Sequence, residues 1–110
     1  MNPTKHSVEY LQAMERRATG IIKRCKHQPM RLYRCAQRSL IRATIHLKLK
    51  EPKVTSKHLH QSINFIKRIS RKKLDRRQEI LIAPRIRELI LNNAMLAITL
   101  AISGMRRADH

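Results

Sequence analysis

Residues 29–50, with the sequence PMRLYRCAQRSLIRATIHLKLK, decide the fold because they combine an apolar helical stripe with a row of arginines. Small and apolar side chains share one side of this segment at about 100° per residue, which predicts an amphipathic helix. They are Met30, Tyr33, Ala36, Leu40, Thr44 and Leu47. Pro29 suits the first turn of a helix, since its missing N–H would be unpaired there. The residue before a proline avoids the helical region, so Glu51 and Pro52 are expected to end this helix.

Three further amphipathic segments complete the predicted fold. Helices are expected at residues 7–26, 29–50, 55–73 and 84–103. The sequence shows neither the alternation of a strand nor an internal repeat. The predicted fold class is therefore all-α: a small antiparallel helical bundle of about four helices, in a single domain over residues 1–110.

The expected helix boundaries follow from local signals. Ser7 is the expected N-cap of the first helix, and Thr55 or Ser56 that of the third. Residues 75–82 are interpreted as a junction with at most a turn or two of helix, after which Pro84 restarts the chain. Gly104 is expected to stop the last helix.

Positive charge is both large and unevenly placed. The chain has 25 Lys and Arg against 7 Asp and Glu, for a net charge of +18. Residues 16–77 contain 20 basic residues and 2 acids, while the remainder is balanced. A compact chain with this charge repels itself unless a polyanion neutralises it. With 42% hydrophobic residues and 2 Gly, the composition favours a packed structure over disorder.

Arg31, Arg34, Arg38 and Arg42 form the most informative constellation. Their spacing of 3, 4 and 4 residues predicts one stripe on a helix, spanning roughly 16 Å. Arginine donates bidentate hydrogen bonds to phosphate and stays charged at any relevant pH. No acid lies between Arg16 and Lys50, so the stripe lacks neighbours one turn away to neutralise it. The pattern therefore predicts phosphate binding rather than an ordinary solvated face.

A second basic cluster follows the third predicted helix, and it is interpreted as a clamp on the nucleic-acid backbone. Its members are Lys67, Arg68, Arg71, Lys72, Lys73, Arg76 and Arg77. A nuclear targeting signal is the alternative interpretation. The only aromatic residues, Tyr10, Tyr33 and Phe65, are too few for a single-strand binder that stacks bases on aromatic platforms. The expected modes are phosphate tracking on duplex or folded nucleic acid and stacking of an arginine on an exposed base.

The last predicted helix is apolar nearly all round and is assigned to an oligomer or partner interface. The expected interface residues are Leu89, Leu91, Met95, Leu96, Ile98, Leu100 and Ile102. The apolar stretch from Leu89 to Ser103 falls short of the ~20 residues that a membrane span needs. The bundle is therefore expected to be oligomeric or docked on a partner, without membrane contact.

Metal binding and catalysis are poorly supported. Cys25, His27, Cys35, His58 and His60 do not have the paired spacing of a structural zinc site, and Cys25 continues an apolar helical face. No phosphate loop, nucleophile elbow or metalloprotease motif occurs. The protein is expected to be no enzyme and to need no cofactor, metal or small-molecule substrate.

The sequence thus predicts a non-catalytic nucleic-acid-binding subunit of a ribonucleoprotein or nucleoprotein complex. It would grip the phosphate backbone of structured RNA or duplex DNA with little sequence specificity. RNA is slightly preferred because 15 Arg outnumber 10 Lys. The chain start lacks the apolar core of a signal peptide, and two cysteines do not make a disulfide framework, so an intracellular location is expected: cytoplasm, nucleoid or nucleus.

Two other functions stay open. The first is a DNA-binding regulator or architectural protein that is dimeric through its C-terminal helix. It would be of helix-turn-helix type, with residues 62–70 as the recognition helix, or histone-like around Val54 and Thr55. The second is an adaptor whose charge meets an acidic protein.

Overall fold

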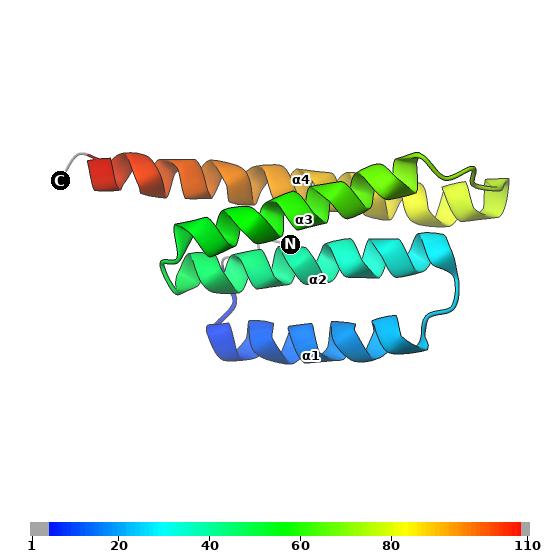
Figure 1. The fold of residues 1–110 in the computed structure, drawn as a ribbon, viewed down its shortest axis with the longest axis horizontal. Helices are drawn as coiled ribbons and strands as arrows, with labels where there is room; N and C mark the ends of the chain where they lie inside the picture. The colour runs from blue at the N-terminus through cyan, green and yellow to red at the C-terminus, as the bar shows by residue number, and fades with distance from the viewer. Residues whose placement is uncertain (1–4, 109–110) are drawn as a thin grey trace.

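The computed structural model describes the backbone of residues 5–108 and the side chains of residues 5–104. These residues form four helices and no strand: α1 (Val8–Arg24), α2 (Gln28–Lys48), α3 (Pro52–Ser70) and α4 (Arg76–Ala108). Successive helices run in opposite directions along the long axis of the molecule (Figure 1). The predicted all-α fold with four helices is confirmed.

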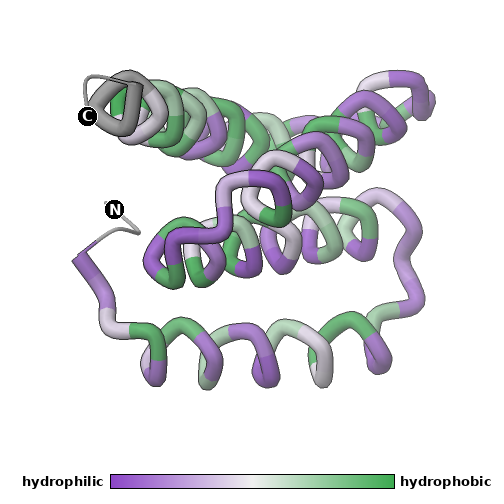
Figure 2. Tube along the Cα trace, turned by 60° about the vertical axis from the view of Figure 1, so that its left-hand side comes forward, coloured by the Kyte–Doolittle hydropathy of each residue, from purple (hydrophilic) through white to green (hydrophobic). Residues whose placement is uncertain are grey.

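Helix α2 is the centre of the molecule. It packs against each of the other three helices. Figure 2 shows α1 on one side of α2, with α3 and α4 on the other. The larger hydrophobic core joins α2, α3 and α4, and its buried members are Leu32, Tyr33, Ala36, Leu40, Ala43, Leu59, Ile69, Ile82, Leu89 and Leu96. A smaller cluster of Leu11, Ile41 and Ile45 attaches α1 to α2.

Local sequence signals explain where α1 and α3 begin. The Ser7 side chain accepts a hydrogen bond from the backbone N–H of Tyr10 at 3.2 Å, as expected for an N-cap. Helix α3 begins at Pro52, earlier than predicted, because a proline is tolerated in the first turn as well as after a helix end. Thr55 is therefore no cap: it is fully buried, and its hydroxyl donates to the Glu51 carbonyl at 2.9 Å.

Helix α4 is much longer than the segment predicted for residues 84–103. Asp75 and Gln78 cap its start reciprocally, with the Gln78 N–H donating to Asp75 Oδ1 at 2.8 Å and the Asp75 N–H to Gln78 Oε1 at 3.2 Å. Pro84 lies inside the helix, where it removes one backbone hydrogen bond without ending the helix. Gly104 does not stop it either, since α4 continues to Ala108.

The sequence argument against a membrane span was that the apolar stretch from Leu89 to Ser103 is too short. Helix α4, at 33 residues, is long enough, so this argument no longer holds. From Arg76 to Gly104 the helix is long and apolar enough to cross a bilayer, by length and composition only. Its inner face is nevertheless built into the protein. Asn93, 5% exposed, donates to Ser62 Oγ of α3 at 3.1 Å, and that hydroxyl donates to the Ala36 carbonyl of α2 at 2.9 Å.

Candidate nucleic-acid interface

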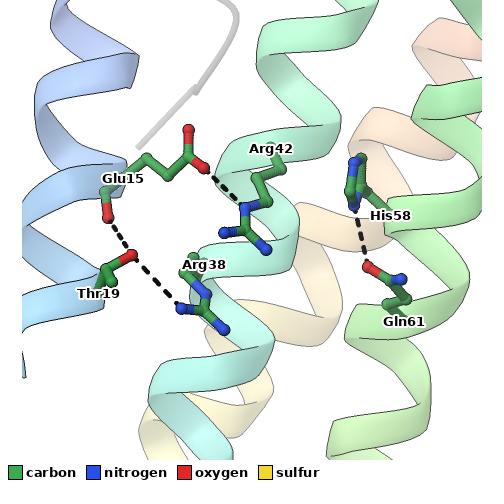
Figure 3. A network of polar contacts seen from close by, with 6 residues as sticks. All are labelled: Glu15, Thr19, Arg38, Arg42, His58 and Gln61. Atoms are coloured by element: carbon green, nitrogen blue, oxygen red, sulfur yellow. Dashed lines mark hydrogen bonds and ion pairs between the residues drawn. The ribbon is translucent and has the colours of Figure 1, made fainter. Parts of the chain in front are cut away.

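The predicted arginine stripe lies where α2 is flanked by α1 and α3. Arg42 Nε is 2.7 Å from Glu15 Oε1, and Arg38 Nη1 donates to Thr19 Oγ1 at 3.4 Å (Figure 3). Both arginines are partly buried, so α1 orients them. The stripe is therefore not an open solvated row, and its one carboxylate neighbour comes from another helix.

The four arginines of the stripe do not act as a single unit. Arg31 is exposed near the start of α2. Arg34 donates to Gln37 Oε1 at 3.2 Å and lies 5.6 Å from the ring centroid of Tyr33, so it contacts its own helix. Arg38 and Arg42 remain together, one helical turn apart.

Arg38 and Arg42 share a surface hollow with α3. We name it the α2–α3 hollow; its volume is about 360 Å³, and it is lined by Arg38, Ser39, Arg42, Gln61, Asn64, Phe65 and Arg68. These lining residues supply three guanidinium groups and no carboxylate. Arginine clusters of this kind bind phosphate through bidentate, charge-assisted hydrogen bonds. The hollow is therefore suited to an anionic ligand.

Polar side chains continue along the seam between α2 and α3 beyond the hollow. The rings of His46 and His58 stack with centroids 5.3 Å apart. His58 Nδ1 lies 2.9 Å from Gln61 Oε1 (Figure 3), and because an amide oxygen can only accept, the imidazole donates. This contact leaves the Gln61 NH₂ group, with its two donors, available to the hollow.

The second predicted cluster is divided by the structure. All of its side chains, from Lys67 to Arg77, are exposed. Arg68 lines the α2–α3 hollow and lies 5.6 Å from the ring centroid of Phe65. The other members surround the turn between α3 and α4, at the end of the molecule where α2 begins (Figure 1). Arg68 thus links the two basic regions that the sequence suggested.

The expected interface residues of α4 lie on two different faces. Leu89 and Leu96 are buried in the core of the single chain, and Leu100 packs against that core, so these three are not available to a partner. Four residues remain on the outside, which we name the α4 outer row: Leu91, Met95, Ile98 and Ile102, exposed by 60%, 39%, 60% and 46%.

Part of the lining of the α2–α3 hollow could be predicted from the spacing of polar residues in the sequence. Gln61, Asn64 and Arg68 are spaced by 3 and 4 residues, which predicts a polar stripe on one face of a helix, although Gln61 and Asn64 are not among the predicted site residues. Glu15 and Thr19 carried no such signal, because they reach the arginines only through the packing of α1 on α2. Among the described residues no group of three or more His, Cys, Asp or Glu could hold a metal ion, and Cys25 and Cys35 are free thiols.

No family model matches the sequence, and the chain has no significant similarity to a curated protein or to a solved structure.

Proposed function

We propose that this protein is a non-catalytic, intracellular nucleic-acid-binding subunit of a ribonucleoprotein or nucleoprotein complex. It holds the phosphate backbone with little sequence specificity and prefers structured RNA to duplex DNA. The observation that carries the proposal is the α2–α3 hollow, where Arg38, Arg42 and Arg68 line one depression that has no carboxylate in its wall. Like charges gathered in this way repel one another, so an anionic ligand would stabilise the arrangement.

Phosphate fits this surface better than the carboxylates of an acidic protein. The net charge of +18 and the arginines on both sides of the hollow suit an extended polyanion whose charges repeat along a strand. Arg31, near the start of α2, and the exposed basic residues of the α3–α4 turn offer further contacts at the same end of the molecule. The DNA-binding regulator remains the second candidate, and it would show a strong preference for one sequence.

The decisive measurement is the salt dependence of binding to an RNA hairpin, made with two matched variants. Arg68→Ala removes an exposed arginine of the hollow, and Arg17→Ala removes an exposed arginine from α1. We expect log K to fall steeply with log salt for the wild type. Arg68→Ala should weaken binding by roughly 10-fold, since a hydrogen bond to a charged group contributes about 1.5–3 kcal/mol. Arg17→Ala should change it by less than ~3-fold.

Two outcomes would contradict backbone binding at this site. Affinity that does not change with salt would exclude phosphate contacts as its main source. Equal losses for Arg68→Ala and Arg17→Ala would mean that only net charge matters. Competition with duplex DNA tests the second candidate, since a preference of ~1,000-fold or more for one DNA sequence would support the regulator.

We also propose that the α4 outer row binds a second copy of this chain. Its spacing of 4, 3 and 4 residues is that of a helix seam that packs against another helix. Ala94 and Ala101 are also exposed on α4 between members of the row, and their small side chains would let two helices approach closely. Between residues 87 and 104 the only charges are Arg87 and Glu88, so two highly basic chains could meet here without repulsion.

The oligomeric state tests this surface. Ile98→Glu places a charge in the α4 outer row, while Ile80→Glu makes the same change at a similarly exposed isoleucine, 68% against 60% exposed, in the charged first turns of α4. We expect sedimentation to show a dimer for the wild type and Ile80→Glu, and a monomer for Ile98→Glu. A wild-type chain that stays monomeric at ~100 µM, or that partitions into phosphatidylcholine vesicles, would refute the second copy as the occupant.

A further inference from the structure

We propose that the α2–α3 hollow receives one unpaired nucleotide of the bound nucleic acid. Its α2 side would hold the phosphate, and its α3 side would contact the base. The inference rests on the proposed function, because it specifies which part of a nucleic acid enters the site. It predicts a preference for strands with a bulged or looped nucleotide over a continuous duplex.

The size and the shape of the hollow favour a single nucleotide. A volume of about 360 Å³ lies at the lower end of the range for small-ligand sites, which is ~300–1,000 Å³. The hollow lies between two helices that pack along their length, so a duplex can cross its mouth but cannot enter it. A base that has left the stack can do so, and such bases are the usual targets of specific RNA recognition.

The phosphate end is formed by α2. Arg38 and Arg42 lie about 6 Å apart along the helix, close enough to bind one phosphate group. Arg42 Nε donates a hydrogen bond to Glu15 Oε1, and Arg38 Nη1 donates one to Thr19 Oγ1. Each guanidinium has five N–H donors, so both retain donors for phosphate oxygens. These contacts with α1 hold the two guanidiniums beside the hollow before a ligand arrives.

The base end is formed by α3, which contributes the amide groups of Gln61 and Asn64 and the planar guanidinium of Arg68. Gln61 keeps its NH₂ donors because its oxygen accepts from His58. Asn64 is exposed and carries both donors and acceptors, the groups that pair with the edge of a base. Arg68 lies against the Phe65 ring at 5.6 Å from its centroid, a contact that supports the guanidinium as a surface for stacking.

This division of groups distinguishes a nucleotide from a simple anion. Arginines alone would bind any phosphate or carboxylate with similar preference. Two amides and a supported guanidinium beside them add recognition that only a ligand with a planar, hydrogen-bonding ring can use. The neutral residues of α3 should therefore affect which nucleic acid binds, while the arginines of α2 affect how tightly any nucleic acid binds.

The test compares two blunt RNA duplexes, each annealed from two strands so that neither has a loop, which differ only in one bulged adenosine. Dissociation constants are measured by fluorescence anisotropy at one salt concentration, for the wild type, Asn64→Ala and Asn92→Ala. The first variant changes an exposed residue of the hollow, and the second makes the same change on α4. We expect the wild type and Asn92→Ala to bind the bulged duplex at least ~5-fold more tightly than the fully paired one. Asn64→Ala should reduce that preference to below ~2-fold, because it weakens binding of the bulged duplex.

The outcomes separate this inference from the proposed function. Equal, salt-dependent affinity of the wild type for both duplexes would overturn the nucleotide site and leave backbone binding intact. A preference that survives Asn64→Ala and the charge-neutral Gln61→Ala would also overturn it, because the base would then be read elsewhere. Failure to bind either duplex would refute the proposed function as well.

Discussion

Helices α2 and α4 pack on each other in the same core, yet they leave opposite kinds of surface uncovered. On α2, the other helices bury nine residues, from Leu32 to Ile45, and the polar arc that remains holds Arg38 and Arg42. On α4, only the inner face is covered, and the α4 outer row stays exposed although it is apolar. The polar arc of α2 is readily hydrated, but its like charges repel one another. The α4 outer row carries no charge, but exposing its apolar side chains to water is unfavourable.

Under the functions proposed above, the two surfaces would bind different partners. Salt screens the attraction of the arginines for a polyanion, and it does not weaken the burial of apolar side chains. Binding through the α2–α3 hollow should therefore be lost as salt rises, while association through the α4 outer row should persist. Because the surfaces lie on different helices, a dimer could present two copies of the hollow to one nucleic acid.

The inner and outer faces of α4 can be compared most directly by truncating one side chain on each. Leu96 is 1% exposed in the core, and Ile98 is 60% exposed. We expect Leu96→Ala to lower the free energy of unfolding by about 2–5 kcal/mol, because it leaves a cavity. Ile98→Ala should change it by less than ~0.5 kcal/mol in urea titrations at concentrations where the chain is monomeric. Similar losses would mean that the outer row is also covered within one chain.

A smaller effect is expected from the buried polar contacts that join α4 to the other helices. Asn93 donates to Ser62 Oγ at 3.1 Å and to the Leu89 carbonyl at 2.8 Å, and its own Oδ1 is buried without a partner. Asn93→Ala should lower the free energy of unfolding by about 1–2 kcal/mol, since the lost hydrogen bonds are partly offset by removal of the unpaired oxygen. Asn92→Ala, next to it but only partly buried, is the control and should change stability by less than ~0.5 kcal/mol.

The sequence predicted α2 better than α4 for a physical reason. The apolar period of α2 is clear, and Tyr33, Ala36, Leu40 and Thr44 are buried as that period predicts. Between Leu89 and Ile102 nearly every position of α4 is apolar, so this stretch contains no period from which to assign an inner face. Leu89 and Leu96 therefore could not be distinguished from Leu91 and Ile98. The predicted start of α4 is wrong because Pro84 is accommodated inside the helix, which begins after the capping contacts of Asp75 with Gln78.

The arginines of the candidate site could be predicted, but their surroundings could not. Charge and helical spacing identified Arg38, Arg42 and Arg68 within two separate segments. Their meeting in one hollow depends on the register of α2 against α3, which no local pattern fixes. The ion pair of Arg42 with Glu15 joins residues 27 positions apart and depends on the packing of α1.

That ion pair allows the charged surface of α2 to be changed without altering the apolar surface of α4. Both side chains are partly buried, at 33% and 28% exposed, so Glu15→Gln should lower the free energy of unfolding by at most about 1 kcal/mol. It should strengthen RNA binding by roughly 2- to 3-fold, because a negative charge next to the hollow is removed. Glu9→Gln makes the same change at an exposed position in the first turn of α1 and should alter RNA binding less. Equal effects of the two variants would show that only net charge changed.

The smallest effect is expected from Gly20→Ala, which should change the free energy of unfolding without changing RNA binding. Gly20 lies inside α1, and a Cβ there would meet only Arg24 Nη2, at 3.9 Å, an ordinary contact. Gly20→Ala should raise the free energy of unfolding by about 0.5 kcal/mol, because alanine loses less backbone entropy in a helix. Gly104→Ala, where a Cβ would meet nothing within 4 Å, should give less, since it lies near the end of α4. Neither variant changes a group in the α2–α3 hollow, so RNA affinity should stay within ~2-fold. A large loss of affinity in Gly20→Ala alone would mean that α1 must move for the arginines to bind.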